Sequence, residues 1–184
     1  MRAWMIGLAA LGLSACGSDP ASAPAETSDP AAAEAAAAID SSQVTLKGDG
    51  LTVGAEGFYF NAGQTEVETA LAGALGKPSD SGDMLECGAG AMQSSTYAGG
   101  LTANFQDDKL VGWFLRDGAE NIVLENGSSI GAAREDIATL EGFAMIEGST
   151  LGEEFYSESA GIGGFLGDDG TVTELYAGTQ CFFR

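Results

Sequence analysis

Histidine is absent from all 184 residues of this chain. Its absence excludes Ser-His-Asp and Cys-His catalysis, histidine-based zinc sites and the commonest general base of enzymes. Basic residues are also scarce: seven Lys and Arg stand against 27 Asp and Glu, which leaves a net charge of −20. Nucleic-acid binding needs clustered Lys and Arg to neutralise phosphates, so we expect no nucleic-acid partner.

Long apolar runs are also lacking. The run over residues 4–13 follows a basic Met1-Arg2 start and is about half of the roughly 20 residues that span a bilayer. Small residues then precede a cysteine, as at the end of a cleaved secretory signal. The stretch Leu13-Ser14-Ala15-Cys16 resembles the lipobox of bacterial lipoproteins, whose cysteine receives a diacylglyceryl group and whose new amino terminus is acylated, for example with palmitate. We therefore expect a signal peptide over residues 1–15 and lipidation at Cys16.

The residues after the cysteine predict where the protein is held. Gly17 follows Cys16, whereas Asp at this position tends to retain Gram-negative lipoproteins at the inner membrane. The resemblance therefore implies the outer membrane, with the folded part in the periplasm or at the cell surface. Residues 16–42 have almost no large apolar side chains, so we expect a disordered tether. Residues 43–184 are then the exported domain, with 22 acidic residues, six basic residues and a net charge of −16.

Cysteine is also rare. Once Cys16 is lipidated, Cys87 and Cys181 remain, and an even pair in an exported domain predicts a disulfide. The alternative is a reactive thiol at Cys87, but no Lys or Arg is adjacent in the sequence to lower its pKa.

Helical periodicity is clearest over residues 64–76. Thr65 followed by Glu68 fits a capping box, and Gly76 fits a C-terminal stop. A second helix is expected over residues 132–140, between two glycines.

The remaining pattern is typical of antiparallel strands. Apolar segments flank acidic turns over residues 101–115 and over residues 162–176, and both predict hairpins. Asn126-Gly127 is the strongest short hairpin turn and predicts a third hairpin over residues 122–130.

The two longer hairpins resemble each other. Residues 100–108 align with residues 161–169, and each hairpin follows a helix upstream, so the pattern suggests an internal duplication. Chance similarity between glycine-rich hairpins is the alternative. We expect an α+β fold of two tandem helix-plus-antiparallel-sheet halves in one compact domain, with halves of about 43–120 and 121–184.

Two family resemblances follow from these segments. Residues 63–76, 100–102 and 110–113 together resemble one helix-plus-sheet repeat of envelope proteins similar in shape to the β-lactamase inhibitor protein and to the small lipoprotein of the outer-membrane assembly machine. Residues 176–184 resemble a group of uncharacterised alphaproteobacterial lipoproteins, some of which go by the name aspartate-semialdehyde dehydrogenase. That enzyme family uses a cysteine nucleophile, a histidine base and a nucleotide-binding domain. This chain lacks the base and is too short for two such lobes, so its residues do not support the dehydrogenase name.

Motifs for chemistry are incomplete. Residues 127–131 match the G-x-S-x-G nucleophile elbow with Ser129 as nucleophile, but the elbow requires a histidine. Gly76-Lys77 is not a phosphate loop, because Pro78 stands where Ser or Thr must hold the metal. Residues 161–164 do not complete a dinucleotide-binding motif. We therefore expect no catalytic residue, no cofactor and no nucleotide partner.

Acidic turns such as Asp107-Asp108 and Asp168-Asp169 lack the alternating loop of an EF-hand, so we expect no metal site. Asp168-Asp169 supports a different alternative, an inhibitor whose acidic loop enters the basic cleft of an exported enzyme. A third alternative is a histidine-free enzyme in which exposed carboxylates such as Glu153 and Glu154 act as acid and base.

The sequence favours a non-catalytic, lipid-anchored envelope protein that binds another protein or supports assembly at the membrane. Aromatic side chains often anchor interfaces, so Trp113, Tyr97, Phe105 and Tyr176 are the candidate partner-binding residues.

Overall fold

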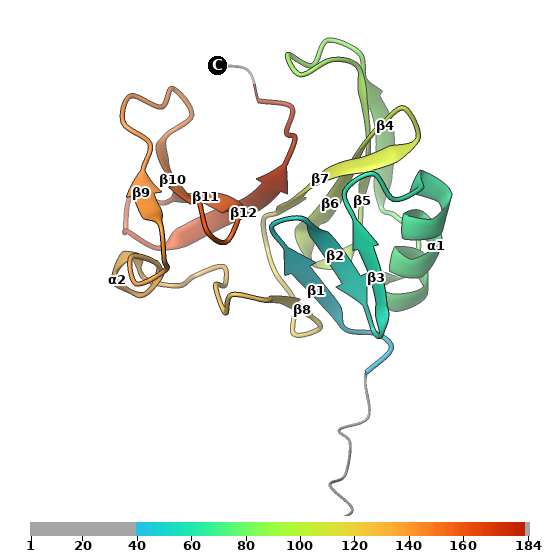
Figure 1. Cartoon of the computed structure of the whole chain (residues 1–184), viewed down its shortest axis with the longest axis horizontal. Coiled ribbons are helices and arrows are strands. Elements are labelled where there is room, and N and C mark those ends of the chain that lie inside the picture. The colour runs from blue at the N-terminus through green and yellow to red at the C-terminus, as the bar shows by residue number, and fades with distance from the viewer. Residues whose placement is uncertain (1–39, 183–184) are drawn as a thin grey trace, which may run out of the picture. The chain divides into compact units, whose positions relative to one another are not determined.

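The computed structural model describes residues 40–182 (Figure 1). The predicted signal peptide, the lipidation site Cys16 and most of the tether lie outside these residues. The described chain is mostly β, with two short helices, α1 (Gln64–Leu75) and α2 (Arg134–Ile137). The strands of the first part are β1 (Val44–Lys47), β2 (Gly50–Val53), β3 (Glu56–Tyr59), β4 (Asp80–Met84), β5 (Met92–Thr96), β6 (Leu101–Gln106) and β7 (Lys109–Leu115). Those of the second part are β8 (Ile122–Leu124), β9 (Phe143–Met145), β10 (Glu153–Ser157), β11 (Ile162–Leu166) and β12 (Val172–Gly178).

The strands form two sheets. The larger sheet has eight antiparallel strands in the order β4-β5-β6-β7-β12-β11-β10-β9. The smaller is a mixed four-stranded sheet in the order β3-β2-β1-β8, in which β8 runs parallel to β1. The fold therefore contains more β structure than the expected α+β class, because the second helix is only four residues long.

Two local features recur on either side of the central β7–β12 pair. Gly63, just before α1, forms a bridge with Lys109, and Ala133, just before α2, forms one with Thr171. The register of β6 against β7 shifts after Asn104, and that of β11 against β12 shifts after Phe165. α1 therefore begins beside the start of β7, and α2 begins beside the start of β12. In each part of the chain, this is the last of the antiparallel strands that follow the helix.

One apolar core joins both sheets and α1. Its fully buried members include Leu46 of β1, Leu71 of α1 and Trp113 of β7. The Trp113 indole Nε1 donates to the carbonyl oxygens of Lys47 at 2.8 Å and Gly50 at 3.1 Å. This side chain therefore fixes the β1–β2 hairpin against the larger sheet through directional bonds as well as burial.

Several predicted elements are confirmed and two are wrong. The helix over 64–76 and both acidic-turn hairpins are present. The capping box is wrong, because α1 begins after Gly63 without a side-chain cap. The third hairpin is also wrong: β8 ends at Leu124, and the backbone N–H of Gly131 donates to Val172 of β12 at 2.7 Å. The chain after the turn leaves β8 because its backbone bonds are made to another strand.

Candidate functional site

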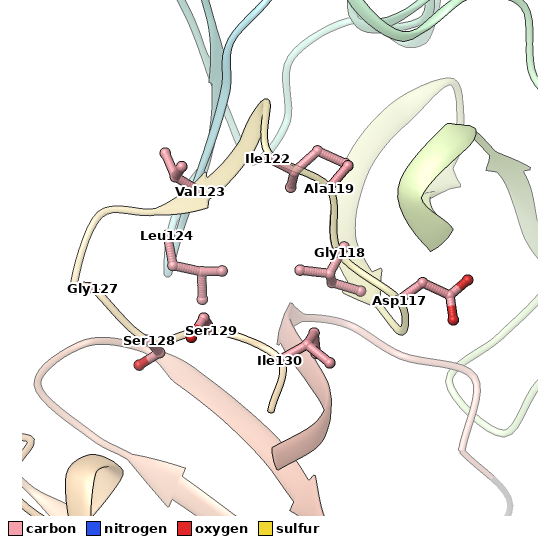
Figure 2. Close-up of a pocket in the computed structure, with 11 residues that line it drawn as sticks. Asp117, Gly118, Ala119, Ile122, Val123, Leu124, Gly127, Ser128, Ser129 and Ile130 are labelled. Carbon is pink, nitrogen blue, oxygen red and sulfur yellow. The ribbon is translucent and has the colours of Figure 1, made fainter. Parts of the chain in front are cut away.

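An apolar cleft opens beside β8 (Figure 2). It has a volume of about 390 Å³, and its apolar lining comes from Leu115, Ala119, Ile122, Val123, Leu124 and Ile130. Leu115, Ile122 and Leu124 are buried members of the core, whereas Val123 and Ile130 are half-buried. Figure 2 shows Leu124 and Ile130 on facing sides of the opening, with the Asp117 carboxylate at its outer edge.

Two glycine turns create this cleft. Gly118 and Gly127 adopt φ angles of 77° and 78°, a region that side chains with a Cβ rarely enter. The backbone N–H of Gly118 donates to Gly99 at 2.8 Å, and that of Ile122 donates to Ala119 at 2.9 Å. The chain therefore turns sharply before and after β8, and the two turns form opposite walls without a covering strand.

Residues 127–131, which match the G-x-S-x-G pattern without its histidine, form part of the same wall. The backbone N–H of Ser128 donates to the Asn126 side-chain oxygen at 3.0 Å, which makes the segment a side-chain-stabilised turn. Ser129 is exposed on a loop, and α2 begins only at Arg134. The segment therefore lacks the strand-to-helix geometry that an elbow requires. Ser128 is buried, and its hydroxyl has no partner among residues 40–182.

The edge of the cleft is acidic. Within the part of the chain that the structure describes, the ion pairs are Lys47–Glu125, Arg116–Glu174 and Arg134–Glu153. Asp117, at the cleft, is exposed and belongs to none of these pairs. A ligand that approaches the cleft therefore meets an apolar floor and an uncompensated negative charge.

The four aromatic residues predicted to bind a partner are core residues. Trp113 and Phe105 are fully buried, Tyr97 is 2% exposed and Tyr176 is 7% exposed. Trp113, Phe105 and Tyr97 belong to the apolar core, whereas Tyr176 lies on the other face of β12 against Phe165 and Phe182, so none of the four forms an accessible surface. The exposed large apolar residues are Tyr59, Leu85 and Tyr156.

The proposed acid–base pair is also separated. Glu153 and Glu154 are neighbours on β10 and point to opposite faces of the strand. Glu153 is exposed and pairs with Arg134. Glu154 is fully buried and accepts hydrogen bonds of 2.6 Å from the hydroxyls of Tyr176 and Ser149. The expectation of two exposed carboxylates in one pocket is therefore wrong.

The acidic turn Asp168-Asp169 is exposed, as the inhibitor alternative requires. The side-chain oxygen of Asp169 accepts hydrogen bonds from the Thr171 hydroxyl at 2.8 Å and from its backbone N–H at 3.0 Å. These bonds lower the pKa of Asp169 below its usual value. The carboxylate thus stabilises its own turn.

The two cysteines lie together. Cys87 is buried after β4, Cys181 is half-buried after β12, and both line one pocket. Both are free thiols, so the predicted disulfide is not formed in this structure. Burial, followed by the interaction with Cys87, raises the pKa of the Cys181 thiol to about 11.

A group of polar side chains lies between α1 and strands β4 and β5. Oε1 of Glu68 accepts hydrogen bonds from the Ser95 hydroxyl at 2.7 Å and from Nε2 of Gln64 at 3.1 Å. The Ser81 hydroxyl donates to that of Ser95 at 3.2 Å. Tyr97 is buried nearby, and within residues 40–182 its hydroxyl has no partner. Burial, followed by the charge of Glu68, raises the pKa of Tyr97 to about 12.

Comparison with known proteins identifies no relative: no family model, no curated protein and no solved structure matches this chain. No helix among residues 40–182 has the length and apolar character needed to cross a membrane. The resemblances suggested by the sequence therefore stay predictions.

Proposed function

We propose that this chain is a lipid-anchored envelope protein, held at the outer membrane, that binds a protein partner without catalysing a reaction. The observation that carries the binding part is the apolar cleft beside β8. We propose that the cleft receives an apolar side chain from a cationic segment of the partner.

The shape and lining of the cleft support this occupant. Its volume of about 390 Å³ is large enough to admit a large apolar side chain, and Leu124 and Ile130 line it. Burying a Leu or Phe side chain contributes about 1.5–3 kcal/mol. One apolar side chain buried in the cleft would then supply much of the binding energy, because a few central residues commonly dominate the affinity of an interface.

Charge supports the cationic character of the partner. The exported region carries a net charge of −16, and Asp117 at the cleft is without an ion pair among the described residues. Opposite charges raise the rate of encounter more than they raise the final affinity. Binding should therefore weaken as salt screens the attraction.

The tandem organisation is part of the same proposal. We propose that the regions of about 43–120 and 121–184 derive from duplication of one helix-plus-antiparallel-sheet unit. The strand order is symmetric about the β7–β12 pair, and the helix-start bridges and register shifts recur in both parts. The cleft lies where the chain passes from one unit to the other.

Site-specific photo-cross-linking in intact envelopes tests the binding proposal. A photoreactive residue at Ser129, which is exposed and lines the cleft, should capture one protein through a segment rich in Lys or Arg. The matched control is Tyr59, which is 66% exposed on β3 and should not capture it. Ile130→Glu should abolish the Ser129 adduct, and about 0.5 M NaCl should reduce it.

Equal capture from both positions would refute the cleft as the binding site, and so would an adduct that survives Ile130→Glu in protein with an unchanged circular dichroism spectrum. No adduct from Ser129 would also count against it. The identity of the captured protein separates an assembly factor from an exported enzyme that this chain inhibits.

Anchoring is tested separately. Cys16→Ser removes the sulfur that the diacylglyceryl group needs, so the protein should move from the membrane fraction to the soluble envelope fraction. Retention in the membrane fraction would overturn the lipid anchor and leave the cleft proposal standing.

A further inference from the structure

We infer that Cys87 and Cys181 form a disulfide in the oxidising envelope, and that this bond holds Phe182 over an aromatic cluster of Phe114, Phe165 and Tyr176. The bond would make exposure of that cluster depend on redox state. This site is separate from the cleft beside β8 and does not depend on the proposed partner.

The fold brings the two thiols together before any bond forms. Gln180 fixes the segment after β12: its Nε2 donates to the carbonyl oxygens of Ala177 at 2.7 Å and Trp113 at 3.0 Å. Its Oε1 accepts from Nδ2 of Asn104 at 2.9 Å. The segment therefore runs across β6 and β7 towards the loop that carries Cys87.

The loop that carries Cys87 is also held. Nε2 of Gln106 donates to the carbonyl oxygens of Ala89 at 3.0 Å and Gly90 at 3.3 Å. Cys87 is 7% exposed, and Cys181 lines the same pocket beside it. Two thiols brought to one pocket by separately anchored segments need little rearrangement to pair.

Phe182 is the side chain that the bond would fix. Its ring centroid lies 5.1 Å from that of Tyr176, 5.6 Å from Phe165 and 6.3 Å from Phe114, all in edge-to-face geometry. The segment after β12 belongs to no strand. Near β12 it is held by the backbone N–H of Thr179, which donates to Val111 at 2.8 Å, and by Gln180; further along, Phe182 packs on the aromatic rings.

Disulfide formation needs an oxidant, and a disulfide carried by an envelope thiol oxidase or a small molecule supplies it by thiol–disulfide exchange. Each cysteine gives up one proton and one electron. The oxidant's disulfide accepts both electrons and both protons and becomes two thiols. The pKa of the Cys181 thiol is raised to about 11, so little thiolate is present to attack the oxidant, and Cys181 leaves slowly when a small thiol attacks the Cys87 sulfur.

The first test is the state of the thiols in protein taken directly from the envelope. Cells are quenched in acid, alkylated without reduction, and the protein is analysed by intact mass. We expect neither Cys87 nor Cys181 to be alkylated until a reductant is added. Full alkylation of both residues in the unreduced sample would overturn the disulfide.

The second test asks whether the disulfide keeps Phe182 over the aromatic cluster. Reduction should speed exchange of the Thr179 amide, which donates to Val111, by about tenfold and increase the fluorescence of an apolar dye. Phe182→Ala should raise dye binding in the oxidised protein. Cys87→Ser should behave like the reduced protein and show no further response to reductant. If reduction changes neither amide exchange nor dye fluorescence in protein that stays folded, then redox state does not control exposure of the aromatic cluster, and this part of the inference is refuted.

Discussion

The buried hydroxyl of Tyr97 should lower the stability of this fold. Tyr97 is 2% exposed, and within residues 40–182 its hydroxyl has no hydrogen-bond partner. An unpartnered polar group in the interior costs about 1–3 kcal/mol, because it loses its hydrogen bonds to water. Tyr97→Phe keeps the ring and removes the hydroxyl, so we expect the free energy of unfolding to rise by about 1 kcal/mol at pH 7.

The pH dependence supplies an independent readout. The pKa of Tyr97 is raised to about 12 in the folded protein, from 10.0. Below pH 10 both the folded and the unfolded states keep the proton. Between pH 10 and 12 the unfolded state loses it first, so stability should fall with rising pH, by up to about 2.7 kcal/mol for two pKa units. Tyr97→Phe should remove this part of the alkaline loss.

Urea unfolding followed by fluorescence measures both effects. The matched control is Tyr59→Phe, because Tyr59 is 66% exposed and its substitution should leave the urea midpoint at pH 7 unchanged. A loss of 1 kcal/mol or more in Tyr97→Phe at pH 7, with an unchanged denaturant slope, would refute the reasoning. It would mean that the hydroxyl makes a stabilising bond.

Other substitutions should act in defined directions. Tyr176→Phe removes the hydroxyl that donates to buried Glu154 at 2.6 Å and should cost about 2 kcal/mol in urea unfolding; no loss would show that this bond is not stabilising. Gly73→Ala should raise the free energy of unfolding by about 0.5–1 kcal/mol, because Gly73 lies inside α1 and an added Cβ meets no atom within 4 Å; a lower melting temperature would contradict this. Gly178→Ala should cost at least about 3 kcal/mol, since its φ is 69° and the added Cβ meets backbone; a melting temperature close to that of the parent would contradict this. In reduced protein at pH 8, Cys181 should react with iodoacetamide about tenfold more slowly than an unperturbed thiol, because its raised pKa cuts the thiolate fraction about 100-fold while the more basic thiolate is more nucleophilic; equal rates would contradict the raised pKa.

The regular elements were predictable because local pattern determines them. The α1 periodicity and the two acidic turns each lie within a short window, and the structure places a helix and two hairpins there. The hairpin predicted around Asn126-Gly127 was wrong, because a strong local turn signal does not guarantee that the two flanking segments pair with each other. The flanks bond instead to β1 and β12, which are distant in sequence.

Which side chains are accessible, and where the cleft lies, were harder to predict than the helix and the hairpins. Trp113 and Phe114 are consecutive strand residues, so alternation alone places them on opposite faces and does not say which face another sheet covers. The four-stranded sheet covers the Trp113 face, and this depends on long-range packing. The cleft beside β8 is made by loops, and its only sequence signal is the pair of turn glycines, Gly118 and Gly127.

The position of β12 has a consequence for how the chain folds. It is the last strand in the sequence, yet it lies in the centre of the eight-stranded sheet, between β7 and β11. Until it is in place, β7 and β11 each present an unpaired edge, which is a template for pairing with another chain. Pairing β12 with β7 also joins residues far apart in sequence, which slows folding. A newly synthesised chain therefore passes through a stage with two unpaired strand edges, and its abundant carboxylates, through mutual repulsion, would help to keep such chains apart until β12 pairs with β7 and β11.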